Sequence, residues 1–138
     1  MRHFVIQFLM VCTGFFSGAS LAQLPPSKTQ GDLTFITGGI GSDESSAIFA
    51  AAKKWSLLIE MSEIDGSGRG VWIAGIDIRV LNAKQQSILE TVCDGPLMLL
   101  NAPPGQYTVE ASYQGKLLKP SVVLKEGDPQ KLTLFWRP

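Results

Sequence analysis

Hydrophobic and polar residues alternate along most of the chain after residue 56, in short runs that end at turn residues. The clearest run lies at 107–113, where Tyr107, Val109, Ala111 and Tyr113 alternate with polar residues. A period of two predicts antiparallel strands buried on one face. The pattern predicts further strands at 57–62, 76–80, 87–93, 97–100, 116–125 and 131–136, with Leu132, Leu134 and Trp136 facing inward.

Two runs depart from strict alternation, since Leu58 interrupts the first strand and 97–100 is apolar throughout. Turn residues still recur about every 8–12 positions, as in sandwiches and barrels. The chain from 56 to 138 therefore predicts an all-β domain of seven antiparallel strands, built as a sandwich or a small barrel.

A different pattern occupies 38–55, where a glycine-rich loop precedes a helical segment. Ser42 or Asp43 can cap the helix, Asp43 and Glu44 lie in its first turn, and Lys53 and Lys54 lie in its last. These charges complement the helix dipole. We predict one short helix at 43–54, with one face formed by Ile48, Ala51, Ala52 and Trp55.

The N-terminal segment has the pattern of an export signal. A basic start at 1–3 precedes an apolar stretch at 4–16, and Ser20 and Ala22 place small residues before Gln23. We interpret 1–22 as a cleaved secretory signal peptide, because the apolar stretch is too short to span a membrane. Lipid attachment at Cys12 is the weaker alternative. Residues 23–37 are polar and proline-containing, which predicts a flexible leader. The expected location is the periplasm or outside the cell.

The charge balance and the small number of histidines and cysteines exclude several classes of function. The 138 residues carry 12 Lys+Arg and 12 Asp+Glu with no basic run, so a nucleic-acid partner is not expected. The single histidine is His3, and the two cysteines are Cys12 and Cys93. After signal removal no histidine remains for a catalytic triad and no disulfide can form within the chain. We expect no enzyme activity, no cofactor and no metal, and a Cys93 that packs as a small hydrophobic residue.

Three segments of the chain, 75–85, 91–96 and 100–109, together resemble the carboxypeptidase regulatory-like domain family. The last contains the Pro-Pro-Gly-x-Tyr-Thr-Val element at 103–109. The resemblance covers about 71–136 and implies a prealbumin-like (transthyretin-like, Ig-like) β-sandwich of seven strands. It also implies an accessory role without a common active site. It does not account for the loop and helix at 38–55. The transthyretin-like hydrolases differ, since they use histidines and end in Tyr-Arg-Gly-Ser.

Two places are candidates for contact with a partner. Trp72 follows the glycine-rich loop at 65–70, where exposure is expected, whereas the other large aromatic residues of the strands fit the core better. At the helix start, free amides near Gly39, Gly41, Ser42 and Asp43 could hold an anion or a partner carboxylate, although no phosphate-loop motif is present.

The leading functional hypothesis is an exported, non-catalytic β-sandwich that works through contact with a protein of the periplasm or cell envelope. The alternative is a domain of the same fold that binds a small ligand or a carbohydrate through Trp72 and nearby loops.

Overall fold

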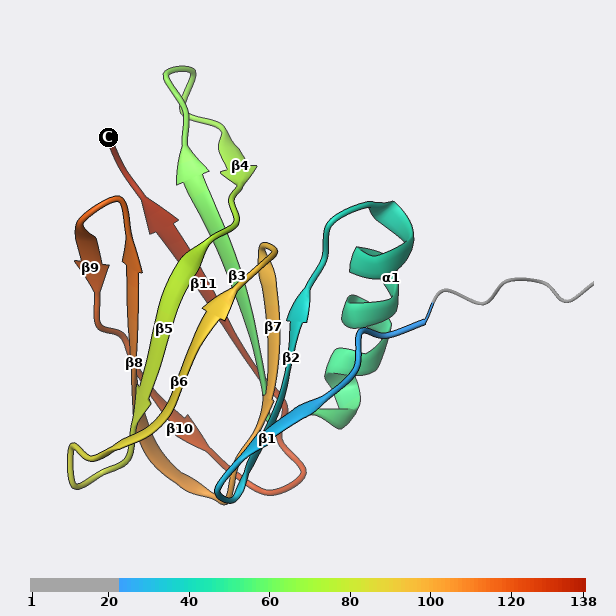
Figure 1. Ribbon diagram of the computed structural model, residues 1–138, viewed down its shortest axis with the longest axis vertical. Coiled ribbons are helices and arrows are strands. Elements are labelled where there is room, and N and C mark those ends of the chain that lie inside the picture. The colour runs from blue at the N-terminus through green and yellow to red at the C-terminus, as the bar shows by residue number, and fades with distance from the viewer. Residues whose placement is uncertain (1–22) are drawn as a thin grey trace, which may run out of the picture.

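Two β-sheets face each other, and a helix lies against the outer face of one of them (Figure 1). The computed structural model describes residues 23–138, so the predicted signal peptide at 1–22 lies outside the described residues. Sheet A contains β1 (Lys28–Gln30), β2 (Leu33–Gly38), β3 (Leu57–Ile64), β4 (Gly70–Trp72), β7 (Leu97–Asn101) and β11 (Gln130–Trp136). Sheet B contains β5 (Ile76–Leu81), β6 (Ser87–Cys93), β8 (Gly105–Tyr113), β9 (Lys116–Leu118) and β10 (Ser121–Leu124). The helices are α1 (Ser42–Ala51) and the short 3-10 helix η1 (Ala52–Lys54).

The strand order of sheet A is β1-β2-β7-β3-β11, and that of sheet B is β10-β8-β5-β6. Two short strands extend these ladders, because β4 pairs with the end of β3 and β9 with the end of β8. The prediction of a purely antiparallel sandwich is wrong at one pair. β11 runs parallel to β3, from Gln130 opposite Leu57 to Trp136 opposite Glu63. The chain reaches β11 by crossing over from β10 in sheet B rather than by a hairpin within one sheet.

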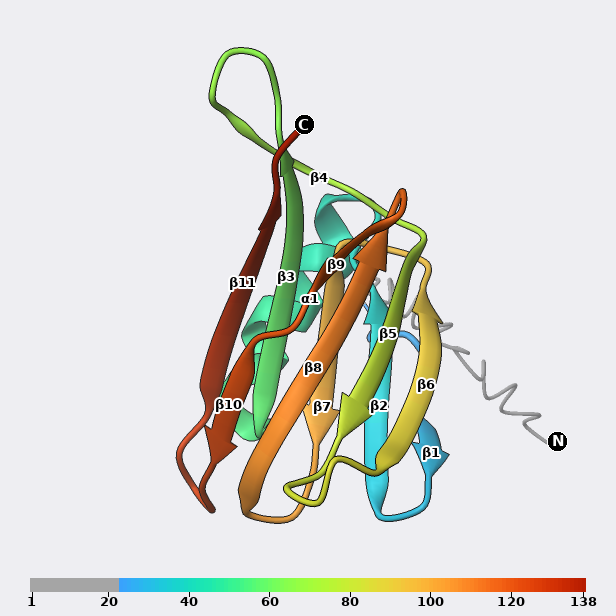
Figure 2. The ribbon, with the colours of Figure 1, turned by 90° about the vertical axis from the view of Figure 1, so that its left-hand side faces the viewer.

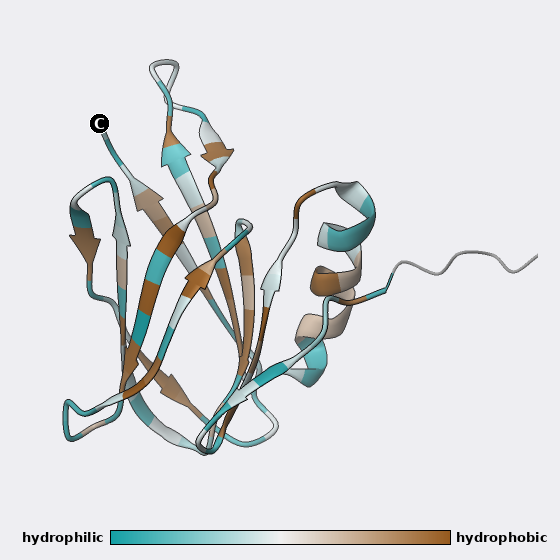
Figure 3. Cartoon of the chain, in the orientation of Figure 1, coloured by the Kyte–Doolittle hydropathy of each residue, from teal (hydrophilic) through white to brown (hydrophobic). Residues whose placement is uncertain are grey.

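The main core fills the space between the two sheets (Figures 2 and 3). The alternating residues of β8, Tyr107, Val109 and Ala111, are buried as predicted, and Tyr113 packs at the core's margin. Trp136 is also buried and meets the Tyr113 ring edge-on, with centroids 5.9 Å apart. The inward faces read from the sequence are therefore confirmed.

A second, smaller core lies between sheet A and α1. Ile48 of the helix is fully buried against apolar side chains of three strands, Ile36, Leu58, Leu97 and Leu99. Ala51, Ala52 and Trp55 pack at its margin, which confirms the predicted helix face. β3 and β7 are thus covered on both sides, by the sandwich core and by α1. This explains why Leu58 breaks the alternation and why 97–100 is apolar throughout, since a strand buried on both faces needs no polar side.

Two further expectations need correction. The predicted flexible leader at 23–37 contains β1 and most of β2, and Leu33, Phe35 and Ile36 within it are buried. The sandwich has eleven strands rather than seven, because β1, β2 and β4 are added and the run 116–125 divides into β9 and β10 at Pro120. Proline supplies no backbone N–H to a ladder, which favours a break there.

A candidate contact surface around Trp72

Trp72 lies at the end of β4, opposite Ser62 of β3, and 44% of its surface is exposed. The predicted exposure of this residue is confirmed. Its indole Nε1 donates a hydrogen bond of 3.0 Å to Oε1 of Glu60, a residue of β3. The bond fixes the orientation of an exposed tryptophan, which therefore loses little rotamer freedom when a partner packs on it.

Glu60 connects Trp72 to the neighbouring edge strand. Its second oxygen, Oε2, lies 3.0 Å from Nζ of Lys131 in β11. Partial burial of the Glu60 carboxyl raises its pKa, but the hydrogen bonds from Trp72 and Lys131 and the charge of Lys131 outweigh this effect. The pKa of Glu60 is therefore below its usual value. The carboxylate remains ionised at neutral pH and is neutralised by Lys131.

The helix supplies a second aromatic residue to this place. The ring of Phe49 in α1 lies 6.1 Å from the Trp72 ring, centroid to centroid, at an interplanar angle of 32°. Nζ of Lys131 lies 5.8 Å from the centroid of the Phe49 ring, within the range of a cation–π contact. Phe49 is itself 37% exposed. Helix and sheet therefore meet at four side chains, since Phe49 contacts Trp72 and Lys131, and Glu60 binds the same two residues.

Phe135 extends the apolar area along β11. Its backbone partner is Ser62, which on its other side faces Trp72. A Cβ placed on Gly70 of β4 would lie 3.3 Å from the Phe135 ring, so the ring extends across β3 toward β4. Phe135 is 46% exposed. We call Phe49, Glu60, Trp72, Lys131 and Phe135 the aromatic surface. Its two charges pair with each other, so the surface combines three exposed aromatic rings with a charge pair that is already satisfied.

The predicted contact residues at the helix start do not join this surface, because the helix residue that meets Trp72 is Phe49, two turns after Ser42. The Gly39 amide is already occupied by Oε1 of Glu44 at 2.8 Å, so it is not free to hold an anion. Gly39 also has φ +98, and a Cβ there would lie 2.9 Å from the Leu97 side chain. Gly39 is therefore explained by its positive φ and by its close approach to Leu97.

The expected helix cap is wrong as well. Gly41 is the N-cap residue and the structure shows no side-chain hydrogen bond to the first turn from Ser42 or Asp43. Instead, the Ser42 carbonyl accepts a 3.2 Å bond from the Ser45 hydroxyl. Asp43 and Glu44 do lie in the first turn, where their charge suits the helix dipole. Ser42 and Asp43 are exposed but make no cluster with another candidate group.

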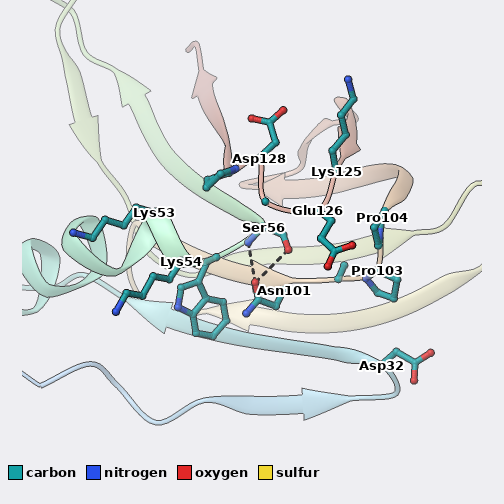
Figure 4. Close-up of a pocket in the computed structure, with 14 residues that line it drawn as sticks. Asp32, Lys53, Lys54, Ser56, Asn101, Pro103, Pro104, Lys125, Glu126 and Asp128 are labelled. Carbon is teal, nitrogen blue, oxygen red and sulfur yellow. Dashed lines mark hydrogen bonds between the residues drawn. The ribbon is translucent and has the colours of Figure 1, made fainter.

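A groove of about 570 Å³ lies at the other end of the sandwich, where η1 meets the loops after β7 and β10 (Figures 1 and 4). The groove could not be predicted from the sequence, because its lining residues come from four separate segments. In Figure 4 the side chain of Asn101 is held from one side, accepting bonds from the Ser56 amide at 2.8 Å and hydroxyl at 3.2 Å. The charged lining is mixed, with Lys53, Lys54 and Lys125 against Asp32, Glu126 and Asp128. This balance favours no charged ligand.

A shallow hollow of about 510 Å³ lies on the outer face of sheet B. Arg79 of β5 is paired with Glu110 of β8 at 3.0 Å and lies opposite Glu90 of β6. Leu117 and Val92 are exposed beside this row of charges. The row is a cross-strand ion-pair ladder of the kind that stabilises a solvent-facing sheet.

Cys93 is buried in the main core, with its sulfur 3.8 Å from the sulfur of Met98. Burial, together with the nearby charge of Asp94, raises the pKa of the Cys93 thiol to about 12. The thiolate is the reactive form of cysteine. Cys93 is therefore a packing residue, as its sequence context predicted.

Within residues 23–138, no three His, Cys, Asp or Glu side chains gather into a group able to hold a metal ion. Neither α1 nor η1, the helices described, has the length and hydrophobicity of a helix that crosses a bilayer. The chain matches no family model and no curated protein.

Proposed function

We propose that this protein is an exported, non-catalytic β-sandwich that acts in the periplasm or cell envelope by binding another protein through the aromatic surface. The observation that carries the proposal is the exposed Trp72 ring, held in one orientation by Glu60 and Phe49. Tryptophan is among the residues that dominate binding energy at protein interfaces, most of all where its orientation is fixed in advance.

The chemistry of the surface favours an apolar, uncharged contact on the partner. Glu60 and Lys131 satisfy each other, so neither charge needs a counter-charge from outside. The exposed parts of the surface are the Phe49, Trp72 and Phe135 rings together with the Lys131 side chain, whose ammonium group is already paired with Glu60. Binding of this kind depends little on ionic strength, because salt screens charged contacts and leaves apolar burial intact.

The resemblance to the carboxypeptidase regulatory-like domain family supports an accessory role and remains part of the proposal. Its most distinctive element, 103–109, has a structural use in this chain: the Tyr107 hydroxyl donates a 2.6 Å bond to the Pro103 carbonyl. This bond closes the turn into β8, much as a tyrosine corner does in Ig-like sandwiches. The element therefore serves the fold rather than a reaction.

The test is site-specific photo-crosslinking in the producing cell. A photoreactive side chain is placed at Trp72, at Phe135, or at Val123, which is 52% exposed on sheet B and serves as the control. We expect the same protein to be crosslinked from Trp72 and from Phe135 but not from Val123. That protein, once purified, should bind the wild type and lose at least tenfold in affinity for Trp72→Ala, about 1.4 kcal/mol or more. Equal binding of the variant contradicts the proposal.

A second candidate, carbohydrate binding, is favoured by one observation: an exposed tryptophan face beside the carboxylate of Glu60. Aromatic faces stack on the apolar faces of sugar rings, and a carboxylate accepts hydrogen bonds from hydroxyl groups. Titration with soluble cell-wall oligosaccharides separates the two candidates. Saturable quenching of tryptophan emission that disappears in Trp72→Phe supports the carbohydrate, and an unchanged spectrum in both proteins rejects it.

Export itself has a direct test. Intact-mass measurement of protein purified from the cell envelope should give a chain that begins at Gln23, because 20–22 fit a signal-peptidase site. A chain that retains residues 1–22 contradicts the predicted cleavage.

A further inference from the structure

Each sheet has two edges, and three of the four edges are short, covered or interrupted. β1 is only three residues long. The edge of β6 is covered by the side-chain amide of Gln30. Its nitrogen donates a hydrogen bond of 2.8 Å to the Glu90 carbonyl, and its oxygen accepts one of 3.1 Å from the Glu90 backbone amide. The edge formed by β9 and β10 is broken at Pro120. Such devices prevent pairing between chains.

The fourth edge, β11, has none of these devices except one lysine. It runs without a break for seven residues at the margin of sheet A (Figure 2). The Gln130 backbone amide donates a hydrogen bond of 2.9 Å to the carbonyl of Ser56, the residue just before β3. In a parallel ladder alternate residues bond to the same side, so the backbone groups of Lys131, Thr133 and Phe135 face away from β3. All three side chains are exposed.

We propose that a second copy of this chain covers this edge, with β11 pairing antiparallel to β11 about a twofold axis at Thr133. In this register each residue with outward-facing backbone groups meets another such residue. Thr133 faces Thr133 of the second copy, and Lys131 faces Phe135 of the second copy. Every such pair exchanges two hydrogen bonds.

The side chains of β11 complement themselves in the same register. On the outer face, threonine comes opposite threonine, a favourable cross-strand pair. Lys131 reaches Glu60 of β3 and the Phe135 ring extends across β3 toward β4, so neither side chain blocks the edge. On the inner face, Leu132 comes opposite Leu134, which continues the apolar side of the sheet. A shift by one residue would place core-facing side chains opposite exposed ones, so that register is excluded. This self-complementarity favours a second copy over an unrelated strand.

The dimer has a consequence for the proposed function without depending on it. Antiparallel pairing about a twofold axis keeps outer faces on one side, so the two aromatic surfaces lie on the same face of one continuous sheet. A partner with two matching sites, or two linked partners, would then bind with increased avidity. Either proposal can fail while the other stands, because the dimer uses backbone groups of β11 and the contact surface uses the Trp72 ring.

The first test is molar mass by sedimentation over a dilution series, on protein expressed from its full sequence. We expect a molar mass twice that of the monomer at high concentration, and the monomer mass after dilution. Thr133→Pro should be monomeric at every concentration, because proline removes an outward N–H that pairs with nothing inside the monomer. Its thermal unfolding at low concentration should stay close to that of the wild type. A wild type that is monomeric throughout, or a Thr133→Pro variant that stays dimeric, overturns the proposal.

The second test reads the register and does not require the proline variant to fold. Only a residue on the twofold axis meets its own copy, so Thr133→Cys should form a disulfide-linked dimer under mild oxidation, within the usual Cα separation for disulfides. Phe135→Cys, equally accessible on the same strand, faces Lys131 instead and is the matched control. Rapid crosslinking of Thr133→Cys alone supports the dyad. Equal crosslinking of both variants, or of neither, contradicts it.

Discussion

Replacing Ile48 by alanine tests whether α1 is an integral part of the sandwich. Ile48 has no exposed surface and is the helix residue that enters the small core formed by Ile36, Leu58, Leu97 and Leu99. Truncation of a buried isoleucine removes its transfer free energy and leaves a cavity, at a cost of about 2–5 kcal/mol. The whole domain is stable by only about 5–15 kcal/mol, so the loss is a large fraction of the total.

The assay is unfolding by urea, which gives the free energy, and by heat, which gives Tm, each followed by circular dichroism and by tryptophan emission. For a domain of this size, 1 kcal/mol corresponds to about 4 °C in Tm, so Ile48→Ala should lower Tm by about 8 °C or more. The emission of Trp72, followed in protein whose other two tryptophans, Trp55 and Trp136, are replaced by phenylalanine, reports on the helix, because the Trp72 ring contacts Phe49. If helix and sandwich unfold as one unit, both signals should shift together.

Ile40→Ala is the matched control, since it makes the same chemical change at a residue 66% exposed just before the helix. Its free energy of unfolding should change by no more than about 0.5 kcal/mol. An Ile48→Ala loss below about 1 kcal/mol, or equal losses in both variants, would falsify the assignment of α1 to a packed core. A Trp72 transition that precedes the main transition would show that the helix detaches by itself.

Three further predictions follow from single contacts. Gly95→Ala should lower the free energy of unfolding by about 1–3 kcal/mol in urea, because a Cβ there would collide with the Gly38 carbonyl oxygen. Gly66→Ala is the control and should be nearly neutral, since a Cβ at Gly66 has no atom within 4 Å. Cys93 should not react with a thiol reagent at pH 8 in the folded protein and should react fully in urea, and a fast reaction without urea would contradict its burial. Because the pKa of Glu60 is lowered, its stabilising contribution is present above its ordinary value of 4.5 and is lost as pH falls below it. Wild type should therefore lose its stability advantage over Glu60→Gln in acid, and a constant difference across pH would refute this.

The strands with one solvent-exposed face could be predicted from the sequence. The strands that are covered on their outer face by α1 were harder to recognise. β8 alternates cleanly because sheet B faces solvent on its outer side, and its register of buried residues was correct. β2 could not be recognised, since Leu33–Gly38 is short, follows a polar segment and is buried on both faces by the core and by α1. The parallel pairing of β11 with β3 was also out of reach, because alternation is the same for either direction of the neighbouring strand.

The aromatic surface could likewise be predicted only in part. Trp72 could be selected from its position after a glycine-rich loop, because few residues there can cover a large ring. Phe49, Glu60 and Lys131 gave no signal: each is one residue of a different element, and only the packing of α1 on sheet A brings them together. Of the glycines predicted to form an anion site, Gly39 packs closely against Leu97 and donates its amide to Glu44, and Gly41 adopts a positive φ of +89 with open space around it.

The position of α1 connects stability to the proposed function. Adjacent residues of this helix do different work, since Ile48 points into the small core and Phe49 points onto the aromatic surface. The aromatic surface is therefore built where α1 meets sheet A, because Phe49 comes from the helix and the other four residues come from β3, β4 and β11. A change at Phe49 that leaves Ile48 in place should weaken binding of the proposed partner without unfolding the sandwich.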